Sequence, residues 1–119
     1  MTRSAPEPSS PADASGLLEL YADGADRERE LVALLRDEQG KTSVRSAGVR
    51  LLNASRTRRS ETQDRWNRLT VMGRAQTPAE EEWLAKTGPQ EINRLDGRIR
   101  RVETFLRRHF PNFTEGPRP

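Results

Sequence analysis

The most regular hydrophobic pattern lies in the last third of the chain. Its apolar positions, three and four residues apart in turn, are Ile92, Leu95, Ile99, Val102 and Leu106. This spacing is typical of an α-helix that packs one face against a neighbour. We expect the stripe to hold this helix in place, and we take the same residues as the candidate seam for a partner or for self-association.

A strong helix-start signal precedes that stripe. The stretch "TPAEEEW" places Thr77 at the N-cap, Pro78 at the first helical position and Glu80 at the third, which is a capping box. Gly88–Pro89 then interrupts the pattern, because proline lacks a backbone N–H and clashes with the preceding turn. We expect the helix to kink there or to restart at Pro89.

An earlier, longer helix is predicted from Thr42 or Ser43, either of which suits an N-cap, to about Gly73. Its apolar residues gather at its two ends. The stretch 53–65 between them, "NASRTRRSETQDR", has Ala54 as its only apolar residue. The hydrophobic pattern of this helix is therefore broken in the middle.

The short connection 73–76 predicts that the two long helices are antiparallel neighbours. Folding about it brings Trp66 near Trp83 as a core contact, although both rings would also suit aromatic anchors for a partner or stacking platforms for bases. In the same register the polar stretch 53–65 faces residues 86–98, so we expect the ends of the hairpin to be the most fully buried and its middle the most solvated. The seam residues in that range, Ile92 and Leu95, are expected to be the part left open to a partner.

The first helical region, residues 15–40, is acidic and ends at Gly40. Asp23–Gly24 breaks its pattern, since Asp23 could cap a new helix start. One bent helix and two short helices both fit this pattern.

Together these elements predict an all-α protein, a long antiparallel helical hairpin of coiled-coil type with an additional acidic N-terminal helix. We expect a three-to-four-helix arrangement forming a single helical domain over residues 15–110. Residues 1–14 and 111–119 are rich in proline and small or polar residues, and we interpret them as flexible, disordered tails.

Composition indicates a thin core. Leu, Ile, Val and Phe account for 12, 2, 5 and 3 residues, or 22 of 119, which is below the roughly 20% under which disorder becomes a serious alternative. The formal net charge of +3 is too small to favour disorder. A chain of this kind gains from a partner that completes its core.

The charges are segregated along the chain. Residues 1–40 carry 4 basic and 9 acidic side chains, residues 41–74 carry 9 and 2, and residues 75–119 carry 8 and 7, so the nets of −5, +7 and +1 sum to +3. One hypothesis lays the basic middle helix against nucleic-acid phosphates. The hypothesis we favour pairs it with the acidic first helix. The candidate surface for phosphates or for an acidic partner is Arg56, Arg58, Arg59 and Arg65.

A second nucleic-acid hypothesis concerns "LLNASRTR". A turn-tolerant Asn53 and a Ser55 that opens an arginine-rich helix resemble the turn of a helix-turn-helix motif. Arg58 and Arg59, however, stand where a recognition helix needs apolar residues. The alternative is a continuous helix in which Asn53 and Ser55 point to solvent.

Candidate chemistry is sparse. The single histidine, His109, lies near a helix end, where a cation favours the helix dipole, and no acidic residue is spaced to join it as a metal ligand. There is no cysteine, no phosphate-binding glycine loop and no nucleophile motif. We therefore expect no enzyme activity, no cofactor and no metal.

The function expected from the sequence is that of a non-enzymatic helical protein–protein interaction module, such as an adaptor, assembly factor or small regulator. Its partner would be another protein or a second copy of itself, as a dimer or a hetero-complex. The alternative is a nucleic-acid-binding protein that uses the arginine-rich helix. No apolar run is long enough to span a bilayer, so no membrane partner and a cytoplasmic location are expected.

Overall fold

The computed structural model describes residues 11–71 and 77–111, and every regular element in these ranges is helical. The elements are α1 (Pro11–Ala22), α2 (Glu28–Leu34), α3 (Glu38–Val71), α4 (Pro78–Glu82), the π-helical turn η1 (Trp83–Thr87) and α5 (Gly88–His109). The all-α prediction is confirmed. The predicted connection at 73–76 lies outside the described residues, as do residues 1–10 and 112–119 of the predicted tails.

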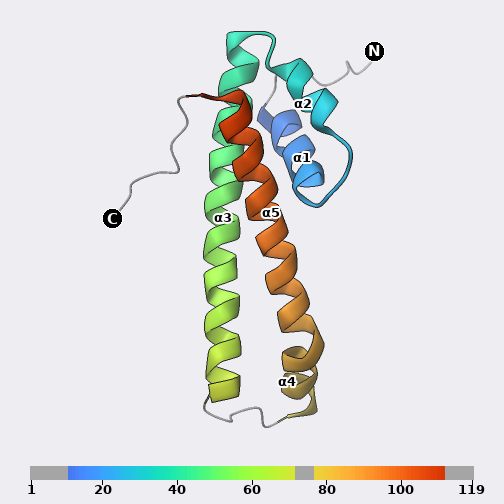
Figure 1. The fold of residues 1–119 in the computed structure, drawn as a ribbon, viewed down its shortest axis with the longest axis vertical. Coiled ribbons are helices and arrows are strands. Elements are labelled where there is room, and N and C mark those ends of the chain that lie inside the picture. Colours follow the sequence, from blue (N-terminus) through green and yellow to red (C-terminus); the bar gives the residue numbers. More distant parts are fainter. Residues whose placement is uncertain (1–10, 72–76, 112–119) are drawn as a thin grey trace, which may run out of the picture.

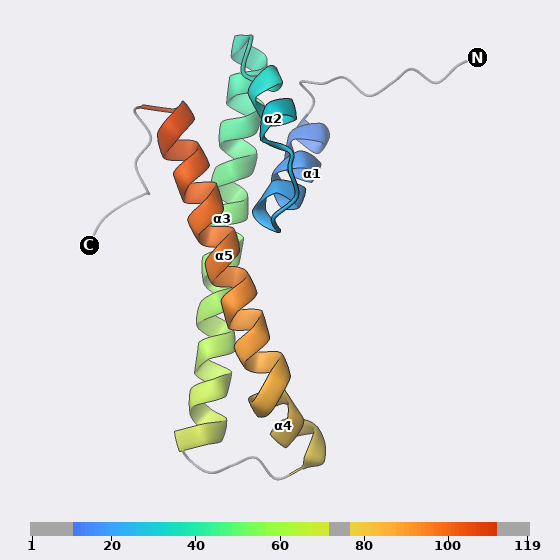
Figure 2. The ribbon, with the colours of Figure 1, turned by 45° about the vertical axis from the view of Figure 1, so that its right-hand side comes forward.

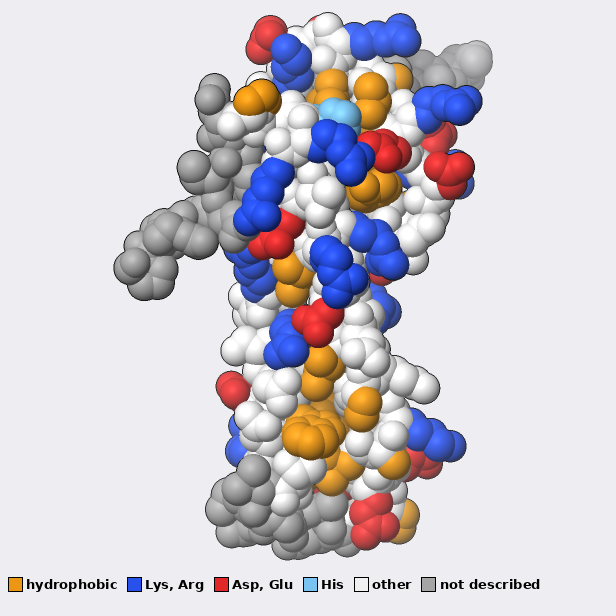
Figure 3. Space-filling model, in the orientation of Figure 1, with side chains coloured by type: hydrophobic (Ala, Val, Ile, Leu, Met, Phe, Trp, Pro, Cys, Tyr) orange, Lys and Arg blue, Asp and Glu red, His pale blue; other side chains and the backbone are white. Residues whose placement is uncertain are grey.

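The long helices α3 and α5 form an antiparallel hairpin, as predicted (Figures 1 and 2). Helices α1 and α2 pack beside one end of it, which we call the proximal end. The distal half comprises residues 56–71 of α3 and residues 78–94 of α4, η1 and α5. Hydrophobic side chains are visible toward both ends of the hairpin, and charged side chains are spread over the upper end and the middle, with a few at the lower edge (Figure 3).

The acidic first region forms two short helices, one of the two arrangements that its sequence allowed. Gly24 ends α1 with a φ of 103°, a conformation that favours glycine. The Ala25 N–H donates to the Leu20 carbonyl at 2.9 Å, and the Gly24 N–H donates to the Tyr21 carbonyl at 3.0 Å, which closes a Schellman-type end. Asp23 does not cap α2, whose N-cap residue is Arg27. The start of α1 at Pro11 lies within the segment 1–14 that composition assigned to a tail.

Helix α3 begins earlier than the sequence predicted. The Asp37 carboxylate accepts a 2.7 Å hydrogen bond from the Gly40 N–H, and the Asp37 carbonyl accepts one from the Lys41 N–H at 3.0 Å. These bonds satisfy amides of the first helical turn. The predictions that Gly40 ends a helix and that Thr42 or Ser43 starts one were therefore wrong.

Gly40 also permits the close approach of α2 to α3. A Cβ atom at this position would lie 1.7 Å from the Leu34 carbonyl oxygen, so a side chain would force the backbone apart. We expect Gly40→Ala to lower the free energy of unfolding by about 1–3 kcal/mol, as overpacking does. The control is Gly16→Ala in α1, where nothing lies within 4 Å, and this change should raise stability by about 0.5–1 kcal/mol. Urea unfolding of both variants checks the pair, and equal stability of Gly40→Ala and wild type would contradict this packing.

The capping box before α4 is confirmed. The Glu80 N–H donates to the Thr77 hydroxyl at 3.1 Å, and the Thr77 N–H donates to the Glu80 carboxylate at 3.3 Å. The interruption predicted at Gly88–Pro89 takes the form of the π-helical turn that precedes it, and the backbone at Gly88 stays helical. The Trp83 ring covers Gly88 so closely that a Cβ there would lie 2.9 Å from a ring carbon.

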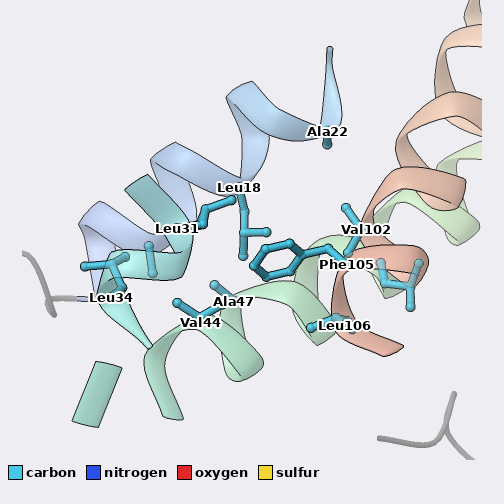
Figure 4. Close-up of a cluster of buried hydrophobic side chains, with 11 residues drawn as sticks. Leu18, Ala22, Leu31, Leu34, Val44, Ala47, Val102, Phe105 and Leu106 are labelled. Atoms are coloured by element: carbon cyan, nitrogen blue, oxygen red, sulfur yellow. The ribbon is translucent and has the colours of Figure 1, made fainter. Parts of the chain in front are cut away.

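The hydrophobic core lies at the proximal end, where α1 and α2 meet α3 and α5. Leu18, Leu31 and Phe105 are fully buried at its centre, and their side chains point toward one another (Figure 4). The Phe105 ring lies 5.5 Å from the Tyr21 ring and 4.5 Å from the His109 ring, measured between centroids. Phe105 thus joins α5 to the layer formed by α1 and α2.

Candidate interaction surface

Helix α3 runs without a break through residues 53–55. The continuous-helix alternative is therefore confirmed and the helix-turn-helix hypothesis is wrong. Ser55, which was expected to point to solvent, is buried instead. Four residues in and just after the stretch 53–65 are spaced by four and three positions and therefore lie on one face of α3. They are Ser55, Arg59, Thr62 and Trp66. Ser55 and Thr62 are buried against α5, so small and polar residues form the middle of the hairpin seam.

Two of the four candidate arginines pair with carboxylates of α5. Arg59 Nε donates to Asp96 Oδ1 at 2.7 Å, and this bond raises the pKa of the Arg59 guanidinium. Arg56 forms a hydrogen-bonded ion pair with Glu103. The favoured hypothesis that this basic stretch pairs with the acidic first helix was wrong for Arg56 and Arg59, because α5 supplies their carboxylates.

The other two arginines line a different face of the hairpin, around a hollow of about 260 Å³. The Arg65 guanidinium lies 4.2 Å from the centroid of the Trp83 ring, a cation–π contact. Arg58 is 66% exposed, and its Nε lies 3.7 Å from a Glu91 oxygen. The structure therefore divides the predicted arginine surface into two closed ion pairs and two looser contacts.

The acidic first region meets a second stripe of α5, which the sequence analysis missed. This stripe consists of Arg94, Arg98, Arg101, Phe105 and Arg108, spaced by four and three residues. Arg98 donates to Asp23 at 2.8 Å, and Arg108 donates to Glu28 at 2.7 Å. His109 Nε2 also lies 3.4 Å from Glu28 Oε2. Helix α5 thus presents acidic residues to α3 and basic residues to α1 and α2, and its regular arginine spacing was the available signal.

Glu91 gives this charge network a dependence on pH. Its hydrogen bond with Arg94 lowers the pKa of the carboxyl, and Arg58 and Arg98 act in the same direction. A carboxyl with a lowered folded-state pKa stabilises the fold above its unfolded pKa of about 4.3, and this contribution is lost as pH falls through the folded-state pKa. We expect Glu91→Gln to reduce the loss of stability between about pH 5 and about pH 3, by less than about 1 kcal/mol because the pair is partly exposed. Thermal unfolding across that range checks this, and an unchanged acid slope would contradict it.

The apolar stripe of α5 is mostly closed within the chain. Leu95, Val102 and Leu106 are at most 2% exposed, whereas Ile92 and Ile99 are half-buried. The expectation that Leu95 stays open to a partner was therefore wrong, because it packs inside the hairpin. Ile92 is the member of the stripe that lies in the distal half.

Ser55 is a weak point of the hairpin seam. Its side chain is 3% exposed, and its hydroxyl has no hydrogen-bond partner among the described residues. Removing a buried unsatisfied hydroxyl and introducing a better helix former both favour folding. We expect Ser55→Ala to raise the free energy of unfolding by about 1 kcal/mol in urea titrations. A fall in stability would show that the hydroxyl is satisfied in solution.

The distal half has no hydrophobic core of its own. Among its described residues no apolar side chain is buried, and the buried positions there are Thr62 and Gly88. Full burial of apolar residues along the hairpin stops at Leu52 on α3 and at Leu95 on α5. Two helices alone leave the apolar residues of this region partly in water.

A shallow hollow of about 240 Å³ opens in the distal half. Its lining residues are Gln63, Trp66, Pro89, Ile92 and Asn93. Trp66 thus lies beside Pro89 and Ile92, whereas Trp83 covers Gly88 and stacks with Arg65. The predicted core contact between the two tryptophans was wrong: both rings are half-buried, and they line different hollows.

No described helix is both long enough and apolar enough to cross a membrane. Within residues 11–71 and 77–111 there is also no group of three or more histidine, aspartate or glutamate side chains placed to hold a metal ion. Comparison with protein-family models, with curated proteins and with solved structures finds no match for this chain.

Proposed function

We propose that this protein is a helical protein–protein interaction module that binds through the distal half of its hairpin. The observation that carries the proposal is the absence of any buried apolar side chain among the described residues of that half. Trp66 and Ile92 are only partly buried there around a hollow, while the proximal end has a core of fully buried apolar side chains. A partner that covers this surface would bury them, and a tryptophan beside a hollow is a frequent anchor of protein interfaces. Action in the cytoplasm as an adaptor, assembly factor or regulator is part of this proposal.

The alternative, binding of nucleic acid through the arginine-rich helix, has less support. Arg56 and Arg59 are held by Glu103 and Asp96, so phosphates would have to displace carboxylates that are already in place. Arg58 and Arg65 share their hollow with Glu61 and Glu91, whose charges oppose an anion. Of the four arginines, Arg65 alone contacts an aromatic ring in place of a carboxylate, so the surface offers less unpaired positive charge than phosphate binding favours.

A site-specific cross-linking experiment in cells tests the proposal. A photo-reactive amino acid replaces Asn93 at the rim of the hollow, and a control chain carries it at the exposed position Ser46 of the proximal end. Extracts are treated with nuclease before the adducts are isolated. We expect covalent adducts with protein from position 93 and few from position 46.

Two results would contradict the proposal. One is the absence of protein adducts at position 93 in cells that produce the chain at its normal level. The other is binding that disappears with nuclease and falls steeply with salt, which would favour the nucleic-acid alternative.

A further inference from the structure

The size of the distal hollow indicates what kind of molecule fits it. At about 240 Å³ it is smaller than the roughly 300–1,000 Å³ of sites that enclose small molecules. It is also shallow, and Trp66, Pro89 and Ile92 lie in one continuous surface around it. Such a surface suits one or two side chains of another protein.

The part of α3 that borders the hollow consists of uncharged residues. The residues that flank Trp66 on this side are spaced by three and four positions and are all uncharged: Ser60, Gln63, Asn67 and Thr70. We call them the neutral stripe. The opposite side of the same helix carries Glu61, Arg65 and Arg68, and Asp64 borders the neutral stripe beside Ser60 and Asn67. Because 33% of the residues in the chain are charged, a row of four uncharged residues along an exposed side of α3 is a distinctive feature of this face.

Arg59, the charged residue between Trp66 and the neutral stripe, is already neutralised. Arg59 binds Asp96 at 2.7 Å and also donates to Gln63 Oε1 at 3.2 Å. Gln63 in turn donates to Asn67 Oδ1 at 3.1 Å. This chain of hydrogen bonds fixes the amides at the edge of the hollow without leaving a net charge.

These properties make the face complementary to itself. A two-fold interface brings each residue near the same patch of the other copy, so any unpaired charge would meet a like charge. Amide groups both donate and accept hydrogen bonds, so two identical amide edges satisfy each other.

We propose that the occupant of this surface is a second copy of the chain, and this inference rests on the proposed function. The distal halves of two hairpins pack face to face about a two-fold axis, with Trp66 and Ile92 of each copy buried in the contact. Two hairpins contribute four helices, so the distal half gains the four-helix core that a single hairpin lacks. Hydrophobic side chains gather on the lower part of the hairpin in Figure 3, below the band of charged side chains.

Sedimentation of the purified full chain tests the proposal. We expect a dimer that persists from low to high salt, because its contact is apolar and neutral. Ile92→Asp should raise the dimer dissociation constant by about thirtyfold or more, the effect of losing an interface hot spot. The control is Val32→Asp on α2, an apolar residue that is 39% exposed at the proximal end, and this variant should remain dimeric. Circular dichroism establishes that both variants keep their helices.

The absence of cysteine from the chain allows a second, independent measurement. Single cysteines replace Asn67 in the neutral stripe, Asn93 at the hollow, and the exposed Glu61 on the opposite side of α3 as control. A short thiol-reactive cross-linker should join two copies through position 67 or 93 and not through position 61. Equal cross-linking at position 61 would overturn the proposed contact.

A monomer at all concentrations would overturn the dimer. If photo-adducts at position 93 then contain a different protein, the proposed function stands and this inference alone is lost. If position 93 yields neither a second copy nor another protein, both proposals fail.

Discussion

Phe105→Ala is expected to lower the free energy of unfolding by about 3–5 kcal/mol, the range for removing a buried phenylalanine. The ring is fully buried and contacts both the α1–α2 layer, through Tyr21, and the end of its own helix, through His109. The total stability of a domain is about 5–15 kcal/mol, so this loss is a large part of it. Chemical denaturation followed by circular dichroism measures the change.

The matched control for Phe105→Ala is Leu20→Ala. Leu20 belongs to α1 but is 47% exposed, so its truncation should change stability by less than about 0.5 kcal/mol. A loss of similar size in both variants would show that α1 is not docked on α5 through Phe105.

Leu95→Asp and Ile92→Asp are expected to behave in opposite ways, although the two residues lie three positions apart on one helix. Leu95 is 2% exposed, so a carboxylate there would be buried without a partner, and we expect a loss of more than about 3 kcal/mol in folding stability. Ile92 is half-buried at the hollow, so its aspartate variant should keep the monomer fold and lose association.

Denaturation of the two variants at a concentration where the chain is monomeric separates these effects. Equal destabilisation by both substitutions would mean that the distal half is as well packed as the middle of the hairpin. That result would remove the reason to assign a partner to this surface.

The sequence predicted a helix boundary correctly where the residues that form the cap lie within a few positions of each other. The capping box of Thr77 and Glu80 needs no tertiary contact, and it forms as expected. The start of α3 was missed because Asp37 caps the helix one turn earlier than expected. Gly40 allows the Leu34 carbonyl to pack closely against α3 and does not end a helix. This packing is a tertiary contact, which the local sequence pattern does not predict.

The hairpin was predictable from the apolar ends of its helices and the short connection, but its register was not. Trp66 lies beside Pro89 and Ile92, whereas Trp83, the first residue of η1, covers Gly88 and stacks with Arg65. The sequence signal for a break at Gly88–Pro89 was correct. A π-helical turn, however, changes the direction of the side chains before it in a way that helical spacing does not predict.

Charge totals by segment concealed the actual pairing. The last third of the chain has a net charge of only +1, yet α5 carries an acidic side toward α3 and a basic side toward α1 and α2. Asp96 and Glu103 neutralise the arginines that suggested a phosphate surface. Opposite charges on two faces of one helix cancel in the total for a segment, so the net charge does not show such an arrangement.

The central claim is that the distal half completes its core only by binding another protein chain, and concentration-dependent hydrogen exchange tests it most directly. At low concentration, amides in the distal half should exchange much faster than those of the proximal end, because few buried contacts protect them. At high concentration the same amides should gain protection in wild type and not in Ile92→Asp, while the proximal end stays unchanged. Uniform protection along α3 and α5 that is independent of concentration would contradict the claim.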